Sequence, residues 1–131
     1  LKQVDTYLNR LNVTKKVNTS YEWAGGGLVS NTRELSRFIE AVFKKEFFSE
    51  ELLMRMIDLS PAQQFNKDSG MGIFMYDIMD RTFYGHGGFY GSIMLYSPKQ
   101  QISLTINIGQ AEADLNPYEL VDAVLNVIER D

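Results

Sequence analysis

The sequence predicts an α+β fold, and three patterns in its 131 residues support that prediction. Two amphipathic helical segments occupy the first half of the chain, and a third ends it. Between them lie three apolar strand segments joined by short connections, which is typical of antiparallel pairing. We therefore expect a three-stranded antiparallel meander, with the C-terminal helix packed on it and two helices preceding it.

The clearest helix is expected from Asn31 to about Lys45. Asn31 and Glu34 have the spacing of a capping pair, which indicates where this helix begins. Apolar residues then recur at the i, i+3, i+4, i+7 and i+8 positions of one helix face. We expect that face to be buried, and it consists of Leu35, Phe38, Ile39, Val42 and Phe43.

A second helix is expected to begin at Ser49 and to end before Pro61, and a third occupies the C-terminal segment. In the third helix, Asn116 is the expected cap, Pro117 lies in the first turn, and Glu119 completes a capping box. The second helix is expected to bury Leu52, Leu53, Met56 and Ile57. The third is expected to bury Leu120, Val121, Val124, Leu125 and Ile128.

The three strands are expected over residues 71–79, 82–96 and 102–108. In the last of these, Ile102, Leu104, Ile106 and Ile108 alternate with polar residues, which is the period-two pattern of a half-buried strand.

Composition limits the class of protein. Hydrophobic residues make up 44% of the chain and charged residues 23%, ordinary values for one globular domain over residues 1–131. The net charge of −4, with scattered lysines and arginines, argues against nucleic-acid binding. No apolar run approaches the ~20 residues of a membrane span. One histidine, no cysteine and scattered carboxylates indicate neither a metal site nor a cofactor.

The only histidine, His86, lies among four glycines in the stretch Tyr-Gly-His-Gly-Gly-Phe-Tyr-Gly of residues 84–91. Glycine weakens a strand, so glycines gathered in one often mark the close approach of a ligand or another backbone. A titratable group at such a place is a candidate site residue. The alternative is a bulged strand whose histidine forms only a structural hydrogen bond.

Other glycine-rich motifs fit poorly. The run Gly25-Gly26-Gly27 lacks the lysine and hydroxyl of a phosphate-binding loop. The glycines of residues 85–91 lack the dinucleotide-binding spacing, and a strand rather than a helix follows them. The oxyanion loop of α/β-hydrolases has a histidine-glycine run, but that family also needs a Gly-x-Ser-x-Gly elbow, which the chain lacks.

Four segments, in order, resemble the serine β-lactamase and penicillin-binding-protein superfamily. Residues 23–38 are similar to a glycine-rich segment that runs into Leu-Val-Ser and a helix, and residues 85–92 resemble the third motif, on the strand lining the active site. Residues 96–102 resemble the hairpin after that motif, and Asp5-Thr6-Tyr7 resembles a segment that follows the second motif. The resemblance implies the C-terminal portion of a β-lactamase-like fold.

The resemblance also shows what is missing. In that superfamily the nucleophile lies in a serine-x-x-lysine motif, and the second motif is usually tyrosine-x-asparagine, both upstream of the matched region. No serine of this chain has a lysine three residues later, and no tyrosine-x-asparagine stands in that role. Because Leu1 is also not a methionine, we expect a C-terminal fragment of a serine hydrolase that is inactive alone. The alternative is a non-catalytic module that binds a peptide or a partner.

The resemblance implies limited roles for the residues that remain. If His86-Gly87-Gly88 takes the place of a lysine-threonine-glycine triplet, the backbone N–H of Phe89 is an oxyanion donor. Gly87 and Gly88 then let a substrate lie close to the strand. His86 stands where lysine is common, and a histidine is only partly charged near neutral pH. Histidine triplets are similar to those of esterases and D-amino-acid peptidases, so we expect such a parent rather than a true β-lactamase, acting on a small molecule or peptide.

Two further expectations depend on the resemblance. The strand that matches Ile102 to Ile108 pairs in that superfamily with N-terminal strands that this chain does not contain, so we expect an exposed edge. An edge of alternating isoleucines tends to pair with another chain, so self-association through this strand is expected. The resemblance also favours an exported or periplasmic location.

Overall fold

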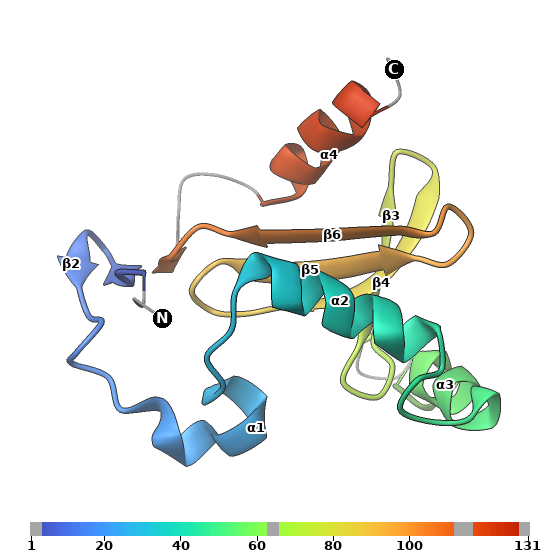
Figure 1. Ribbon diagram of the computed structural model, residues 1–131, viewed down its shortest axis with the longest axis horizontal. Helices are drawn as coiled ribbons and strands as arrows, with labels where there is room; N and C mark the ends of the chain where they lie inside the picture. Colours follow the sequence, from blue (N-terminus) through green and yellow to red (C-terminus); the bar gives the residue numbers. More distant parts are fainter. Residues whose placement is uncertain (1–3, 63–65, 112–116, 129–131) are drawn as a thin grey trace.

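The structure, a computed structural model, describes residues 4–62, 66–111 and 117–128. At its centre lies an antiparallel sheet in the order β3-β4-β5-β6 (Figure 1). The strands are β3 (Phe74–Ile78), β4 (Arg81–Gly87), β5 (Ser92–Ser97) and β6 (Ile102–Asn107). The α-helices are α1 (Trp23–Gly26), α2 (Thr32–Phe43), α3 (Glu50–Ile57) and α4 (Pro117–Ile128). The predicted α+β class is confirmed, and the meander has four strands.

The expected single strand over residues 82–96 is in fact two strands, β4 and β5, joined by a tight turn. The Gly88 N–H donates to the Ser92 carbonyl at 2.6 Å, and the Gly91 N–H donates to the Gly88 carbonyl at 3.0 Å. Gly91 has φ +76°, which suits the last residue of a three-residue hairpin loop because glycine reaches this region without strain. The aromatic residues Phe89 and Tyr90 lie within this turn, so the apolar character of the sequence predicts one strand too few.

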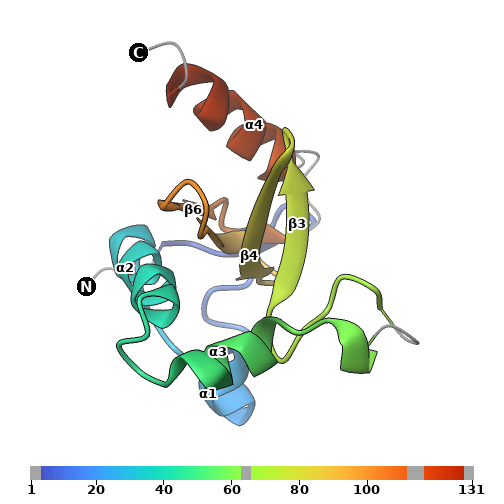
Figure 2. The same cartoon turned by 90° about the vertical axis from the view of Figure 1, so that its right-hand side faces the viewer.

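Helices cover both faces of the sheet, as Figure 2 shows edge-on. Alternate residues of β5 point to opposite faces. Ile93 and Leu95 pack with Val121 and Leu125 of α4, whereas Tyr96 packs with Ile39 of α2. The sheet is therefore the middle of three layers, and it holds β4 between two packed clusters.

Helix α2 lies on the sheet through a face that is turned relative to the predicted one. Its Ser36 hydroxyl lies 2.8 Å from the Ser103 hydroxyl of β6, and Thr105 of β6 donates to the Thr32 carbonyl at 2.8 Å. These contacts place the polar face of β6 against α2. This face is therefore partly covered by the helix. Phe38 is consequently 47% exposed, and its predicted burial is wrong.

The other two predicted helices are present, each with a narrower buried face than expected. Ser49 caps α3 by accepting from the Leu52 N–H at 3.3 Å, and Leu53 is buried whereas Leu52 is exposed. In α4, two residues one turn apart, Val121 and Leu125, are each 1% exposed. The expected burial of Val124 and Ile128 is wrong, because α4 joins the core of the sheet through Val121 and Leu125. The predicted cap Asn116 lies outside the described residues.

A second, small sheet joins the N-terminal segment to the segment that follows β6. Its strands are β1 (Tyr7–Leu8), β2 (Leu11–Asn12) and β7 (Gln110–Ala111), in the order β2-β1-β7, with β1 and β7 parallel. Two 3-10 turns complete the described elements, η1 (Thr19–Glu22) and η2 (Ser60–Ala62). None of the described helices is long and apolar enough to cross a membrane.

Candidate functional site

The candidate site is the end of β4 and the turn that follows it. Gly87, the last residue of β4, pairs with Ile93 of β5, whereas the first residue of β3, Phe74, lies opposite Gly85. Strand β4 therefore extends two residues beyond the start of β3. Because the Gly88 N–H bonds to β5, the ladder alternation directs the Gly87 N–H and carbonyl away from β5, toward the side that β3 leaves open.

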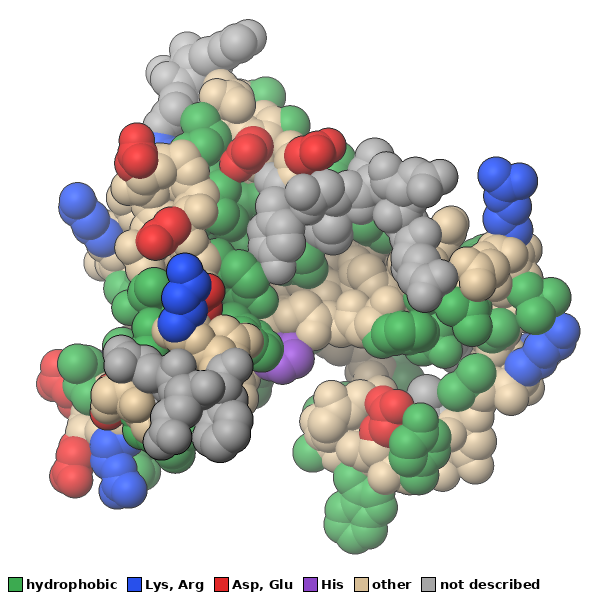
Figure 3. Space-filling view, turned by 180° about the vertical axis from the view of Figure 1, so that it is seen from behind, with side chains coloured by type: hydrophobic (Ala, Val, Ile, Leu, Met, Phe, Trp, Pro, Cys, Tyr) green, Lys and Arg blue, Asp and Glu red, His purple; other side chains and the backbone are tan. Residues whose placement is uncertain are grey.

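His86 is exposed at this end of the sheet. Its Nδ1 lies 2.6 Å from the Gly87 carbonyl oxygen, and its ring centroid lies 5.2 Å from that of Phe74, at an angle of 56°. In the space-filling view of Figure 3 the histidine, in purple, lies at the margin of a hollow between the body of the molecule and the lobe that carries η1 and α1. The imidazole is therefore positioned by its own strand and by β3.

The glycines of the stretch fall into two groups. A Cβ on Gly85 would overlap the Met94 carbonyl oxygen, so this glycine is required by the packing of β4 against β5. A Cβ on Gly87 or Gly88 would meet its nearest neighbours at 3.7 and 3.6 Å, which is ordinary van der Waals distance. The fold does not require glycine at these last two positions, which leaves the strand end open to a close ligand.

Phe89 is the first residue of the turn after Gly88. Its side chain is 67% exposed and contacts Tyr90 edge-on, with ring centroids 5.1 Å apart. The turn uses the N–H groups of Gly88 and Gly91. Within the described residues no hydrogen bond engages the Phe89 N–H. Of the residues assigned to the site, the His86 side chain contacts the Gly87 carbonyl. Gly88 and Phe89 follow directly after the end of β4.

An exposed apolar segment was not assigned to the site from the sequence. Residues 19–30 form the lobe beside the hollow, and they expose Tyr21, Trp23, Leu28 and Val29. Trp23 is 83% exposed and has φ +46°, a strained conformation for a residue with a side chain. A hydrogen bond from Tyr21 to Glu22, and the charge of Glu22, raise the pKa of Tyr21, and Tyr90 adds a smaller effect. In the sequence, the apolar residues on either side of Gly25-Gly26-Gly27 were the feature that could have indicated this exposed segment.

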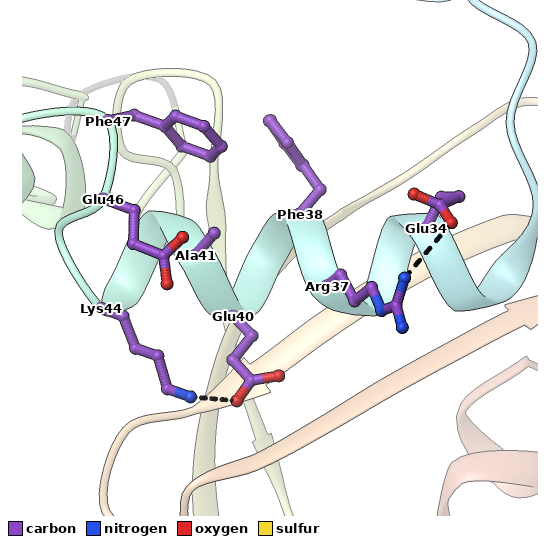
Figure 4. Close-up of a pocket in the computed structure, with 8 residues that line it drawn as sticks. All are labelled: Glu34, Arg37, Phe38, Glu40, Ala41, Lys44, Glu46 and Phe47. Atoms are coloured by element: carbon purple, nitrogen blue, oxygen red, sulfur yellow. Dashed lines mark hydrogen bonds and ion pairs between the residues drawn. The ribbon is translucent and has the colours of Figure 1, made fainter.

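Two other shallow hollows of the described surface lie away from His86. One, of about 470 Å³, lies on the outer face of α2 beside Phe38 and Phe47 (Figure 4). Lys44 pairs with Glu40 at 2.5 Å, which raises the pKa of Lys44, and Arg37 lies 3.7 Å from Glu34. In each of these exposed pairs, the charge of one side chain is balanced by that of the other. Among the described residues, no three acidic, histidine or cysteine side chains form a metal-binding group.

One tripeptide has the letters of the second motif, namely Tyr7-Leu8-Asn9. It overlaps the matched segment Asp5-Thr6-Tyr7, so it does not precede the matched region as a second motif would. Tyr7 donates its backbone N–H to the Gly109 carbonyl at 2.8 Å, and Asn9 and Arg10, with φ +47° and +65°, form the turn between β1 and β2. The tripeptide therefore serves the small sheet.

Comparison with known proteins gives one match. A family model described as Beta-lactamase matches residues 3–122. No curated protein and no solved structure matches the chain. The family match spans the small sheet, the four-stranded sheet and the candidate site. On this ground, and in agreement with the order of its motifs, the chain belongs to the beta-lactamase family.

Proposed function

We propose that this chain is the C-terminal part of a serine hydrolase and supplies the oxyanion-side strand of its acyl-transfer site. The observation that supports this most strongly is the open end of β4, where Gly87 directs its backbone groups away from β5 and lies two residues beyond the start of β3. An acyl-transfer site needs such a strand beside the reacting carbonyl, with an N–H donor aimed at the developing oxyanion.

The residues at the strand end have separate roles in this proposal. The Phe89 N–H, which no hydrogen bond within the described residues engages, donates to the oxyanion. Gly87 and Gly88 leave room for the substrate to lie against the strand. His86 contacts the substrate where a lysine would otherwise supply a permanent cation, which favours an ester or peptide substrate over a β-lactam.

The chain alone is expected to be inactive. No serine in it is followed three residues later by a lysine, so the covalent step needs residues from outside positions 1–131. The test is labelling with a serine-directed fluorophosphonate, on residues 1–131 and on the full-length protein that carries them. The proposal predicts labelling of the full-length protein only. A full-length protein that folds but remains unlabelled supports the alternative, a non-catalytic module that binds a peptide or partner.

We also propose that β6 pairs with a second copy of the chain. It is the edge strand of the described sheet and contains no charged residue or proline. The Ile108 N–H donates to the Gly91 carbonyl at 3.0 Å, so alternation directs the backbone groups of Ser103, Thr105 and Asn107 outward. Two copies of such an edge pair antiparallel about a two-fold axis.

Sedimentation over a range of concentrations tests this pairing with two matched variants. Ser103→Pro removes an outward N–H, whereas Ser103→Ala retains it, and both lose the contact with the Ser36 hydroxyl. The proposal predicts a concentration-dependent dimer for the wild type and for Ser103→Ala, and a monomer for Ser103→Pro. A wild-type monomer at all concentrations rules the pairing out.

A further inference from the structure

The hydrogen bond between His86 and Gly87 determines which imidazole nitrogen carries the proton. A carbonyl oxygen can only accept, so the contact of 2.6 Å between Nδ1 and the Gly87 oxygen requires a proton on Nδ1. In free histidine the commoner neutral form carries its proton on Nε2. The strand end therefore selects the less common tautomer, and it does so through a carbonyl fixed in β4.

This tautomer leaves a lone pair on Nε2 of the neutral ring. Within the described residues, no hydrogen bond engages Nε2. The ring is exposed, and the described ring that lies beside it, tilted by 56°, is the phenyl group of Phe74, which offers no proton. Residues 84–92 include no lysine or arginine that could place a permanent cation in the stretch. When the ring is neutral, the strand end thus presents an acceptor where a lysine would present a donor.

We infer that His86 is a specificity-determining residue that accepts a hydrogen bond at Nε2 from the substrate. The group that it recognises is an amide N–H or a hydroxyl, and a carboxylate at the same position faces a lone pair and is disfavoured. This inference rests on the proposed function, because only that function makes the bound molecule a substrate. The tautomer and the acceptor can be tested without any catalysis.

Because His86 is the only histidine, one imidazole gives all the side-chain ¹⁵N signals of interest. Long-range ¹H–¹⁵N correlation on residues 1–131 at pH about 9, where a histidine ring is neutral, distinguishes the two tautomers. We expect the Nδ1–H pattern in the folded chain and the Nε2–H pattern in the same chain unfolded in urea. An Nε2–H pattern in the folded chain overturns the inference.

A second measurement uses the same signals and two probes of nearly equal shape. Acetamide donates a hydrogen bond, whereas acetate at this pH does not. Titration with acetamide is expected to shift the Nε2 resonance, and titration with sodium acetate at equal ionic strength is expected to leave it in place. An equal or larger shift with acetate contradicts the inference.

In the full-length protein, the readout at the same pH of about 9 is the ratio of kcat/KM for a carboxamide substrate to that for the matching free carboxylate. The inference predicts that His86→Lys lowers this ratio roughly ten-fold, the effect of about one hydrogen bond, and that His86→Gln, which retains an acceptor, preserves it. An unchanged ratio in His86→Lys contradicts the inference. If neither substrate is turned over by wild-type protein, the proposed function fails, and the two NMR experiments still decide the tautomer and the acceptor.

Discussion

Adding one methyl group at Gly85 or at Gly88 distinguishes a glycine that the fold requires from one that a ligand requires. In Gly85→Ala, the new Cβ would overlap the Met94 carbonyl oxygen and lie 2.9 Å from Leu95 Cδ2. Met94 lies in β5, which is paired on both sides, so its carbonyl cannot move aside without breaking the ladder. In Gly88→Ala, the nearest atom is Ser92 Cβ at 3.6 Å, an ordinary contact.

The two variants should therefore differ strongly in stability. Overpacking of a fixed backbone places Gly85→Ala at the upper end of the usual range, a loss of about 3 kcal/mol in the free energy of unfolding. Such a loss lowers the urea midpoint by about 2 M for a chain of this size. Gly88→Ala should remain within about 0.5 kcal/mol of the wild type, because its methyl group has room.

Urea unfolding followed by far-UV circular dichroism measures both differences. In the full-length protein, the proposed function predicts that Gly88→Ala also lowers kcat/KM by about ten-fold or more, since a substrate displaced by a methyl group leaves its reactive position. Equal midpoints for the two variants would refute the packing argument for Gly85. Full activity of Gly88→Ala would refute the assignment of Gly88 to the substrate.

Three smaller predictions concern other parts of the fold. Leu125 is 1% exposed, and Leu125→Ala should lower the free energy of unfolding in urea by about 2–5 kcal/mol. Val127 is 63% exposed, and Val127→Ala should change it by less than about 0.5 kcal/mol. Equal effects would contradict the packing of α4 on the sheet. Asn31→Ala removes an acceptor 3.0 Å from the backbone N–H at the start of α2 and should cost about 1 kcal/mol, and no change would mean that this cap is not formed. Hydrogen bonds from the Ser60 hydroxyl and N–H lower the pKa of Asp58 below its ordinary value of 3.8. The stabilisation of the fold by these bonds is therefore present above pH 3.8 and is lost as the pH falls through the folded-state pKa. A pKa of Asp58 at or above 3.8 in an NMR titration would contradict this prediction.

Local sequence signals predicted the helices well because their causes lie close together in the chain. Asn31 accepts from the Glu34 N–H and Ser49 accepts from the Leu52 N–H, as the capping patterns indicate. The buried faces were less predictable, because the partner of each face is set by tertiary packing. Phe38 matches the apolar period of α2, but the helix lies on β6 through Ser36, and the Phe38 ring packs against that of Phe47 at 5.7 Å.

The division of residues 82–96 into β4 and β5 shows the limit of periodicity in this chain. The glycines were noticed in the sequence as a possible approach of a ligand, but one of them, Gly91, forms the turn, and another, Gly85, serves internal packing. Only a structure separates these uses, because each depends on atoms from another strand. The contact between His86 and Phe74 is equally invisible in the sequence, since it depends on the register of β3 and β4.

The central claim is that Phe89 supplies an oxyanion donor at the end of β4. The most direct measurement is a crystal structure of the full-length protein after reaction with a phosphonate, whose phosphoryl oxygen takes the place of the oxyanion. We expect the phosphoryl oxygen to lie within about 2.7–3.1 Å of the Phe89 nitrogen, with the rest of the adduct beside Gly87 and Gly88. An adduct whose oxygen is bound by other groups, away from the Phe89 N–H, would contradict it.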